Sequence, residues 1–235
     1  MGFLGLGNYS KPGKGVRKDE PKKKRFFLFF EIYFRKFFNL LKLNLLYVLF
    51  CIPIVTIGPA TAAMTKICRC YNEEKPVFLW SDFWDAFKAN FKQGMIIGIL
   101  DILLTALMCV SFVFYFQHTY ESWFYYIPLG LVMMISLITI FANFYIYLMM
   151  VTVDLKTFQL IKNAVLFAFL GMKTNFLTLI FAGIVMVPSI LFFPITVPIL
   201  LLLTFSTTTM ITSFNSWQYI YLYMVRPYYL KPGGS

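Results

Sequence analysis

Long apolar runs alternate with short polar connections along most of this chain. Four runs, each of about 19 to 26 residues, cover approximately positions 93–116, 125–150, 174–193 and 195–213. A helix rises 1.5 Å per residue, so runs of this length cross the roughly 30 Å hydrocarbon core of a bilayer. The pattern predicts four transmembrane helices in an all-α, polytopic membrane protein.

A fifth apolar region, residues 37–68, contains the helix-breaking sequence "PIVTIGPATAA" at positions 53–63. Pro53 lacks an N–H and clashes with the preceding helical turn, Gly58 adopts conformations closed to other residues, and Pro59 suits the first turn of a new helix. These residues predict a re-entrant or short helical hairpin that turns near residues 57–59. A single kinked crossing remains the alternative.

Three further segments have the spacing of amphipathic helices. Residues 26–36 are aromatic-rich but too short and too charged to span, which predicts an interfacial helix in the headgroup region. Residues 155–171 form a similar element between two spans, and residues 81–93 form another, with Ser81 as its expected N-cap. One face of the 81–93 helix carries four aromatic side chains: Phe83, Trp84, Phe87 and Phe91. This face predicts an interface with a membrane surface or a protein partner.

Composition supports the membrane assignment, with 60% hydrophobic residues, 13% charged residues and a mean hydropathy of +0.73. The net charge of +11 is concentrated at the start of the chain, where residues 1–42 carry 11 of the 21 Lys and Arg side chains. Such a segment is retained on the cytoplasmic side, where anionic lipids also attract it. We therefore expect a cytoplasmic N-terminus.

The preference of Lys and Arg for the cytoplasmic side also distinguishes the two topologies of residues 37–68. A single crossing distributes the Lys and Arg side chains 11 inside and 10 outside, whereas a hairpin places all 21 inside. The charge pattern therefore favours the hairpin. On this topology the polar connection at residues 117–124, which carries no Lys or Arg, faces the exterior.

Polar residues within the apolar runs are the candidates for chemistry. Asp101 and Asn143 lie inside predicted spans, where polar groups are costly and therefore often functional, although either can instead bond another helix. Asn44 and the Ser/Thr cluster at 206–213 favour interhelical hydrogen bonding. The single histidine, His118, has no catalytic arrangement around it, and the chain contains no P-loop. We expect no enzyme activity, cofactor, metal or nucleic-acid partner.

The runs "LNLLYVLFCIPIVTIGPATAAM" (43–64), "FWDAFKANFKQG" (83–94) and "LIKNAVLFAF" (160–169) resemble the YesL-like integral membrane proteins of Gram-positive bacteria. The resemblance covers roughly residues 35–215 and implies no catalytic residues. It implies a setting beside carbohydrate importers of the ABC type. The matching motif positions are Asn44, Pro53, Thr56, Gly58, Pro59, Phe83, Trp84, Phe87, Asn90 and Phe91.

These observations predict a basic arm (1–25), an interfacial helix (26–36), a YesL-like membrane domain (37–215) and a cytoplasmic tail (216–235). The leading function is a non-catalytic accessory subunit that stabilises or positions the permease of an ABC-type carbohydrate importer. Its expected partners are membrane lipid and the permease or ATPase subunits. The alternatives are a stand-alone small-solute transporter or channel, and a membrane component of sugar-responsive signalling with a sensor kinase.

Overall fold

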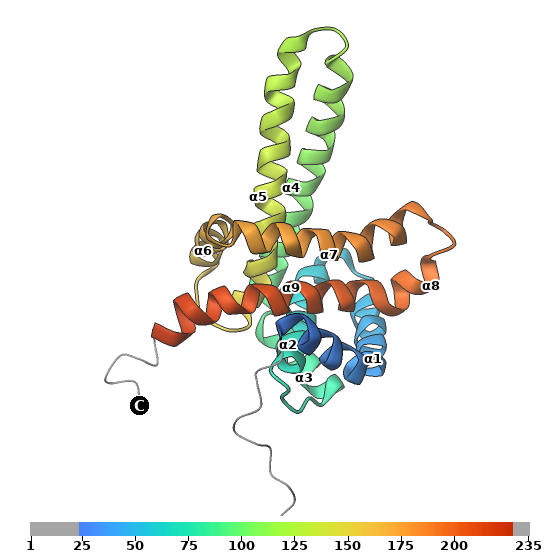
Figure 1. Cartoon of the computed structure of the whole chain (residues 1–235), viewed down its shortest axis with the longest axis vertical. Coiled ribbons are helices and arrows are strands. Elements are labelled where there is room, and N and C mark those ends of the chain that lie inside the picture. The colour runs from blue at the N-terminus through green and yellow to red at the C-terminus, as the bar shows by residue number, and fades with distance from the viewer. Residues whose placement is uncertain (1–23, 228–235) are drawn as a thin grey trace, which may run out of the picture.

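The computed structural model describes residues 24–227, and this part of the chain is built from helices without a strand (Figure 1). The main helices are α1 (Arg25–Phe50), α2 (Ile57–Asn72), α3 (Leu79–Ala89), α4 (Phe91–His118), α5 (Tyr126–Met150), α6 (Thr157–Leu170), α7 (Met172–Leu191), α8 (Val197–Ile199) and α9 (Phe205–Ile220). The short segments are the 3-10 turns η1 (Ile54–Thr56) and η2 (Trp123–Tyr125) and the π-helical turns η3 (Leu200–Thr204) and η4 (Tyr221–Val225). The predicted all-α class is confirmed. The basic arm lies almost wholly outside the described residues.

The fifth apolar region forms an antiparallel helical hairpin of α1 and α2. Near its closed end the Tyr47 hydroxyl lies 3.2 Å from the Thr61 hydroxyl, and near its open end Arg35 pairs with Glu74 at 2.6 Å. The hairpin prediction is therefore confirmed over a single kinked crossing. The turn was misplaced, because the chain reverses over residues 51–56 and Gly58 already lies in the first turn of α2.

Helix α1 runs without interruption from Arg25 to Phe50, although the sequence predicted an interfacial helix at 26–36 and a separate membrane segment starting at 37. No Gly or Pro occurs between these ends, so nothing in the backbone stops the helix. The charges that suggested a boundary are accommodated at the α2 end, where Arg35 meets Glu74 and Lys36 lies over the Tyr71 ring.

Four segments are long and apolar enough to cross a membrane, as predicted: Phe91–His118, Trp123–Met150, Met172–Leu191 and Val197–Val225. The α4–α5 hairpin projects away from the other helices, and α7 and α9 run across its direction (Figure 1). The two apolar helix pairs therefore run in different directions (Figure 1). The last segment extends beyond its predicted end, so residues expected in a tail from 216 are helical as far as residue 227.

Helix α9 lies at the centre of the fold, packed against α1, α2, α5 and α7. Its buried Ser and Thr side chains make the interhelical bonds that the sequence predicted. The Thr207 hydroxyl lies 3.1 Å from the Tyr33 hydroxyl of α1, and the Ser213 hydroxyl accepts a 3.0 Å bond from Asn72 of α2. Short polar side chains at such positions join helices in a medium that offers no water.

Candidate functional site

The reversal between α1 and α2 is held by Thr56. Its hydroxyl lies 2.6 Å from the carbonyl oxygens of both Phe50 and Pro53, and its backbone N–H also donates to the Pro53 oxygen at 3.0 Å. These bonds pair carbonyls that the end of α1 leaves free. Pro53 and Thr56, both predicted as structural motif residues, therefore build one local turn.

Three glycines bring α2 and α4 into backbone contact. A Cβ atom added at Gly58 would lie 1.9 Å from the carbonyl oxygen of Gly94, and one added at Gly98 would lie 2.8 Å from the Gly58 Cα. At Gly94 a Cβ would meet the Pro59 backbone at 2.9 Å. Only glycine allows this approach. Gly94 and Gly98 form a GxxxG pattern that was visible in the sequence but was not used in our prediction.

The aromatic face of α3 packs inside the protein, around Phe50 of α1. The rings of Phe83 and Phe87 lie 5.3 and 5.0 Å from the Phe50 ring, and these two side chains are only 1% and 6% exposed. Phe91 is partly buried against the same cluster. The predicted partner interface was therefore wrong at Phe83 and Phe87, because the face covers an intramolecular surface. Trp84 remains 40% exposed.

The ends of α3 differ from their prediction. The helix begins at Leu79, where the Asp82 carboxylate accepts the Phe78 N–H at 2.8 Å, so Ser81 is not the N-cap. It ends at a break before α4, where the Asn90 side chain donates to the Ala86 carbonyl at 2.9 Å. The predicted continuous helix from 81 to 93 is therefore two helices joined at Asn90.

Asn44 is fully buried and binds the start of the last span. Its side-chain amide donates to the carbonyl oxygens of Leu200 and Leu201 at 3.1 and 2.6 Å, and its Oδ1 accepts the Ser206 N–H at 2.8 Å. Leu200 and Leu201 are the first residues of the π-helical turn η3, and such a turn disturbs the regular helical bonding around it. One side chain of α1 therefore satisfies three backbone groups about 160 residues away in sequence.

A polar cluster joins α4 and α5 next to the glycine contact. The Tyr147 hydroxyl donates to the Asp101 carboxylate at 2.8 Å, and the Asn143 side chain lies beside the same carboxylate. The Asn143 Oδ1 atom is buried without a hydrogen-bond partner. The fold thus brings Asp101 and Asn143 together, although the sequence did not identify them as partners. Such a cluster can hold a proton or coordinate a small cation within an apolar span.

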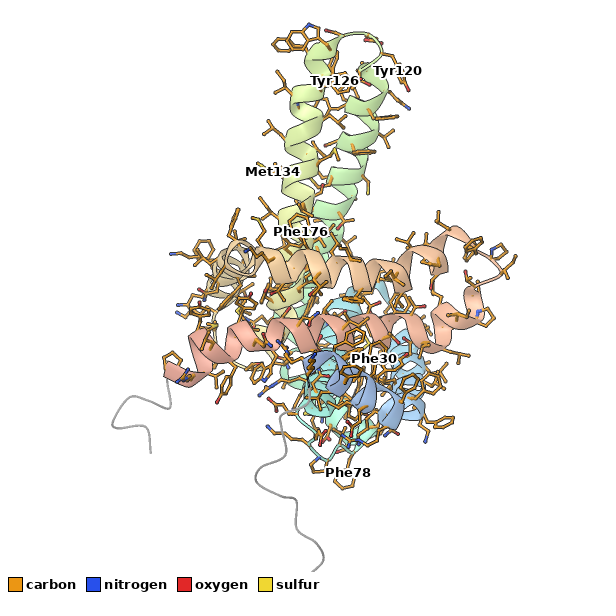
Figure 2. The ribbon with its side chains drawn as sticks, viewed as in Figure 1. Phe30, Phe78, Tyr120, Tyr126, Met134 and Phe176 are labelled. Atoms are coloured by element: carbon orange, nitrogen blue, oxygen red, sulfur yellow. The ribbon has the colours of Figure 1, made fainter. Side chains whose placement is uncertain are left out.

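Charged side chains gather around the end of α2 and the start of α3. Glu73 pairs with Arg69 at 3.3 Å and with Lys75 at 2.6 Å, and the Arg69 guanidinium lies 4.2 Å from the centre of the Trp217 ring. This charged end of the molecule lies opposite the tip of the α4–α5 hairpin. Figure 2 shows this from the positions of Phe78, at the charged end, and Tyr120, at the tip. The connection at the tip carries no Lys or Arg.

The cysteines do not form a reactive or metal-binding group within residues 24–227. All four are free thiols, and Cys68 is completely buried. Burial raises the pKa of the Cys70 thiol, which opposes formation of the reactive thiolate. No group of three or more His, Cys, Asp and Glu side chains in the described part of the chain is placed to hold a metal ion.

A family model described as a protein of unknown function, DUF624, matches residues 40–112. This segment includes the α1–α2 hairpin turn, the glycine contact, α3 and Asp101. No curated protein and no solved structure matches the chain. The similarity therefore centres on the region where α1 to α4 pack together.

Proposed function

We propose that this protein is a non-catalytic accessory subunit of a membrane assembly. Its resemblance to YesL-like proteins extends the proposal to the permease of an ABC-type carbohydrate importer. On this proposal the charged end and the N-terminus lie on the cytoplasmic side of the bacterial cell membrane, where ATPase subunits bind. The protein then acts by occupying a surface of the permease.

The observation that carries the proposal is an exposed apolar face around the outer side of Phe50. We call it the docking face and define it by Phe78, Trp80 and Trp84. These side chains are 78%, 63% and 40% exposed. The Trp80 and Trp84 rings lie 6.2 and 5.7 Å from the Phe50 ring, so the outer aromatics continue the internal cluster.

The rim of the docking face is polar, as expected of a protein interface. Asp82 and Asp85 follow Trp80 on α3, and Asp85 pairs with Lys88 at 3.4 Å. Exposed apolar patches rimmed by polar groups mark protein or membrane interaction sites. Tryptophans at the centre of an interface contribute about 2 kcal/mol or more each to binding. Phe78 lies at the end of the molecule opposite the hairpin tip, which favours a partner on the charged side (Figure 2).

The test is recovery of importer subunits with the tagged full-length protein from native membranes in mild detergent. We expect wild type to recover permease or ATPase subunits and the double variant Trp80→Ser, Trp84→Ser to recover far less at equal abundance. The matched control is Trp123→Ser, because Trp123 is 72% exposed at the other end of the molecule. The proposal fails if wild type recovers neither subunit, or if the control loses them equally.

The polar cluster at Asp101 favours transport as a second candidate function. A transporter needs the carboxylate charge, whereas a structural hydrogen-bonding group does not. If the cluster is structural, Asp101→Asn keeps assembly and sugar-dependent growth while Asp101→Leu impairs both. Loss of growth with Asp101→Asn at normal abundance and assembly would favour the transporter.

A further inference from the structure

A cleft of about 600 Å³ lies between α1 and α7, with α9 as its floor. Its walls are largely apolar, with Phe26 and Phe30 from α1, Leu177 and Ile184 from α7, and Ile211 from α9. Figure 2 labels Phe30, one of the residues that α1 contributes to this cleft. The volume is within the range of sites that bind small molecules.

The cleft has one polar end. Arg25 lies there with Asn215 and Gln218, whereas the opposite end is closed by the bond between Tyr33 and Thr207. The Arg25 guanidinium donates to the Phe214 carbonyl at 2.9 Å and lies 4.9 Å from the centre of the Phe214 ring. Burial lowers the pKa of Arg25, but an arginine stays charged in proteins. Arg25 is the one charged side chain among the described residues that line the cleft.

The length of the cleft suits an acyl chain. On α7 its lining residues run from Thr174 to Val185, a helical rise of about 16 Å. An acyl chain that fills one leaflet spans about 15 Å, half of the roughly 30 Å hydrocarbon core. The α7 wall belongs to an apolar span, and Ile184 is exposed on it, so an occupant can enter sideways from the membrane. Lys173 places a further positive charge next to Thr174, which lines the polar end and bonds Tyr219 of α9.

We propose that this cleft binds one anionic phospholipid, with its phosphate on Arg25 and an acyl chain between α1 and α7. A guanidinium offers paired donors that fit a phosphate oxygen pair. Basic pockets between membrane helices are known sites for anionic headgroups. The bulky walls favour a flexible chain over a partner helix, because close helix contacts in membranes use small residues.

The experiment titrates the delipidated full-length protein with phosphatidylglycerol or phosphatidylcholine of identical acyl chains and counts bound lipid by native mass spectrometry. We expect one phosphatidylglycerol to bind at least fivefold more tightly than phosphatidylcholine. Arg25→Gln should abolish this preference, and Arg25→Lys should keep part of it because the charge remains. The matched control is Arg226→Gln, which removes an exposed positive charge outside the cleft and should leave the preference unchanged.

A second pair of variants tests the acyl-chain site. Ile184→Trp fills the cleft and should weaken binding of both lipids at least fivefold, whereas Ile180→Trp, also on the exposed side of α7 but outside the cleft, should not. Equal headgroup preference in wild type and Arg25→Gln would overturn the proposal. So would equal lipid binding by the two tryptophan variants, or a photocrosslinker at position 184 that captures another polypeptide instead of lipid.

Discussion

Replacement of Asn44 by leucine tests the contact between α1 and the π-helical turn of the last span. Leucine has a similar volume, so the variant removes hydrogen bonds without opening a large cavity. The carbonyls of Leu200 and Leu201 and the N–H of Ser206 would lose their partner. Interhelical hydrogen bonds in membranes contribute about 0.6 kcal/mol each, and a buried polar group left unpaired costs about 1–3 kcal/mol. Three lost bonds at about 0.6 kcal/mol each give about 2 kcal/mol, and one group left without any new partner, at about 2 kcal/mol, raises the destabilisation to about 4 kcal/mol.

A buried native thiol reports this loss. Cys68 is fully buried, and its sulfur lies 3.8 Å from the carbonyl oxygen of Ser206. In a variant whose other three cysteines are replaced by serine, a fluorogenic thiol reagent reacts only when α2 and α9 separate. At roughly 2–4 °C per kcal/mol for a chain of this size, we expect Asn44→Leu to lower the midpoint of thermal labelling by roughly 4–16 °C.

The control is Asn39→Leu, a similar change at a partly buried position of the same helix. It should lower the midpoint by less than about 2 °C, corresponding to under about 1 kcal/mol. Equal midpoints for Asn44→Leu and Asn39→Leu would refute the assignment of Asn44 as the group that pairs the η3 backbone.

Two further substitutions test other contacts, and a labelling experiment tests the orientation in the membrane. Gly58→Ala forces α2 away from α4 and should lower the thermal midpoint, whereas Gly130→Ala, which meets nothing within 4 Å, should leave it unchanged or higher; a tolerated Gly58→Ala would contradict the backbone contact. Phe87→Ala should cost about 3–5 kcal/mol of stability, measured by the same labelling, because the ring is buried in the core. In intact cells a cysteine at Glu121 should react with an impermeant thiol reagent and one at Asp154 should not; labelling at Asp154 would exclude the proposed orientation.

Hydropathy was sufficient to predict the four long spans to within a few residues at most ends. The exception is the end of the last span, which was placed at 213 although the helix continues to residue 227. In the fold Asn215 donates a 3.0 Å bond to the Thr178 hydroxyl, so a polar residue continues the helix by bonding a neighbour. A pattern that averages hydrophobicity does not distinguish a polar group that has a partner from one in water.

The α1–α2 hairpin was predictable for a different reason. The charge distribution favoured it over a single crossing, whereas the helix breakers placed its turn a few residues too late. The partners of Asn44 and Asp101 were not predictable, because each bonds a residue far away in sequence. The aromatic pattern of α3 predicted an interface with the membrane surface or a partner, and it could not show that Phe50 of the same chain covers Phe83 and Phe87. Amphipathicity indicates that a face is covered, and the covering element depends on the fold.

The position of α9 at the centre of the fold has a consequence for synthesis at the ribosome. The α1–α2 and α4–α5 hairpins leave the ribosome first, yet Asn44, Cys68 and Asn72 all find their partners on a segment made last. Domains form in the order of translation where their contacts are local, but here the nascent chain carries unpaired amide groups until its final helix inserts. A product that stops before residue 200 therefore exposes buried polar groups to lipid, which gives membrane proteases and insertases a chemical mark that distinguishes incomplete copies from finished ones.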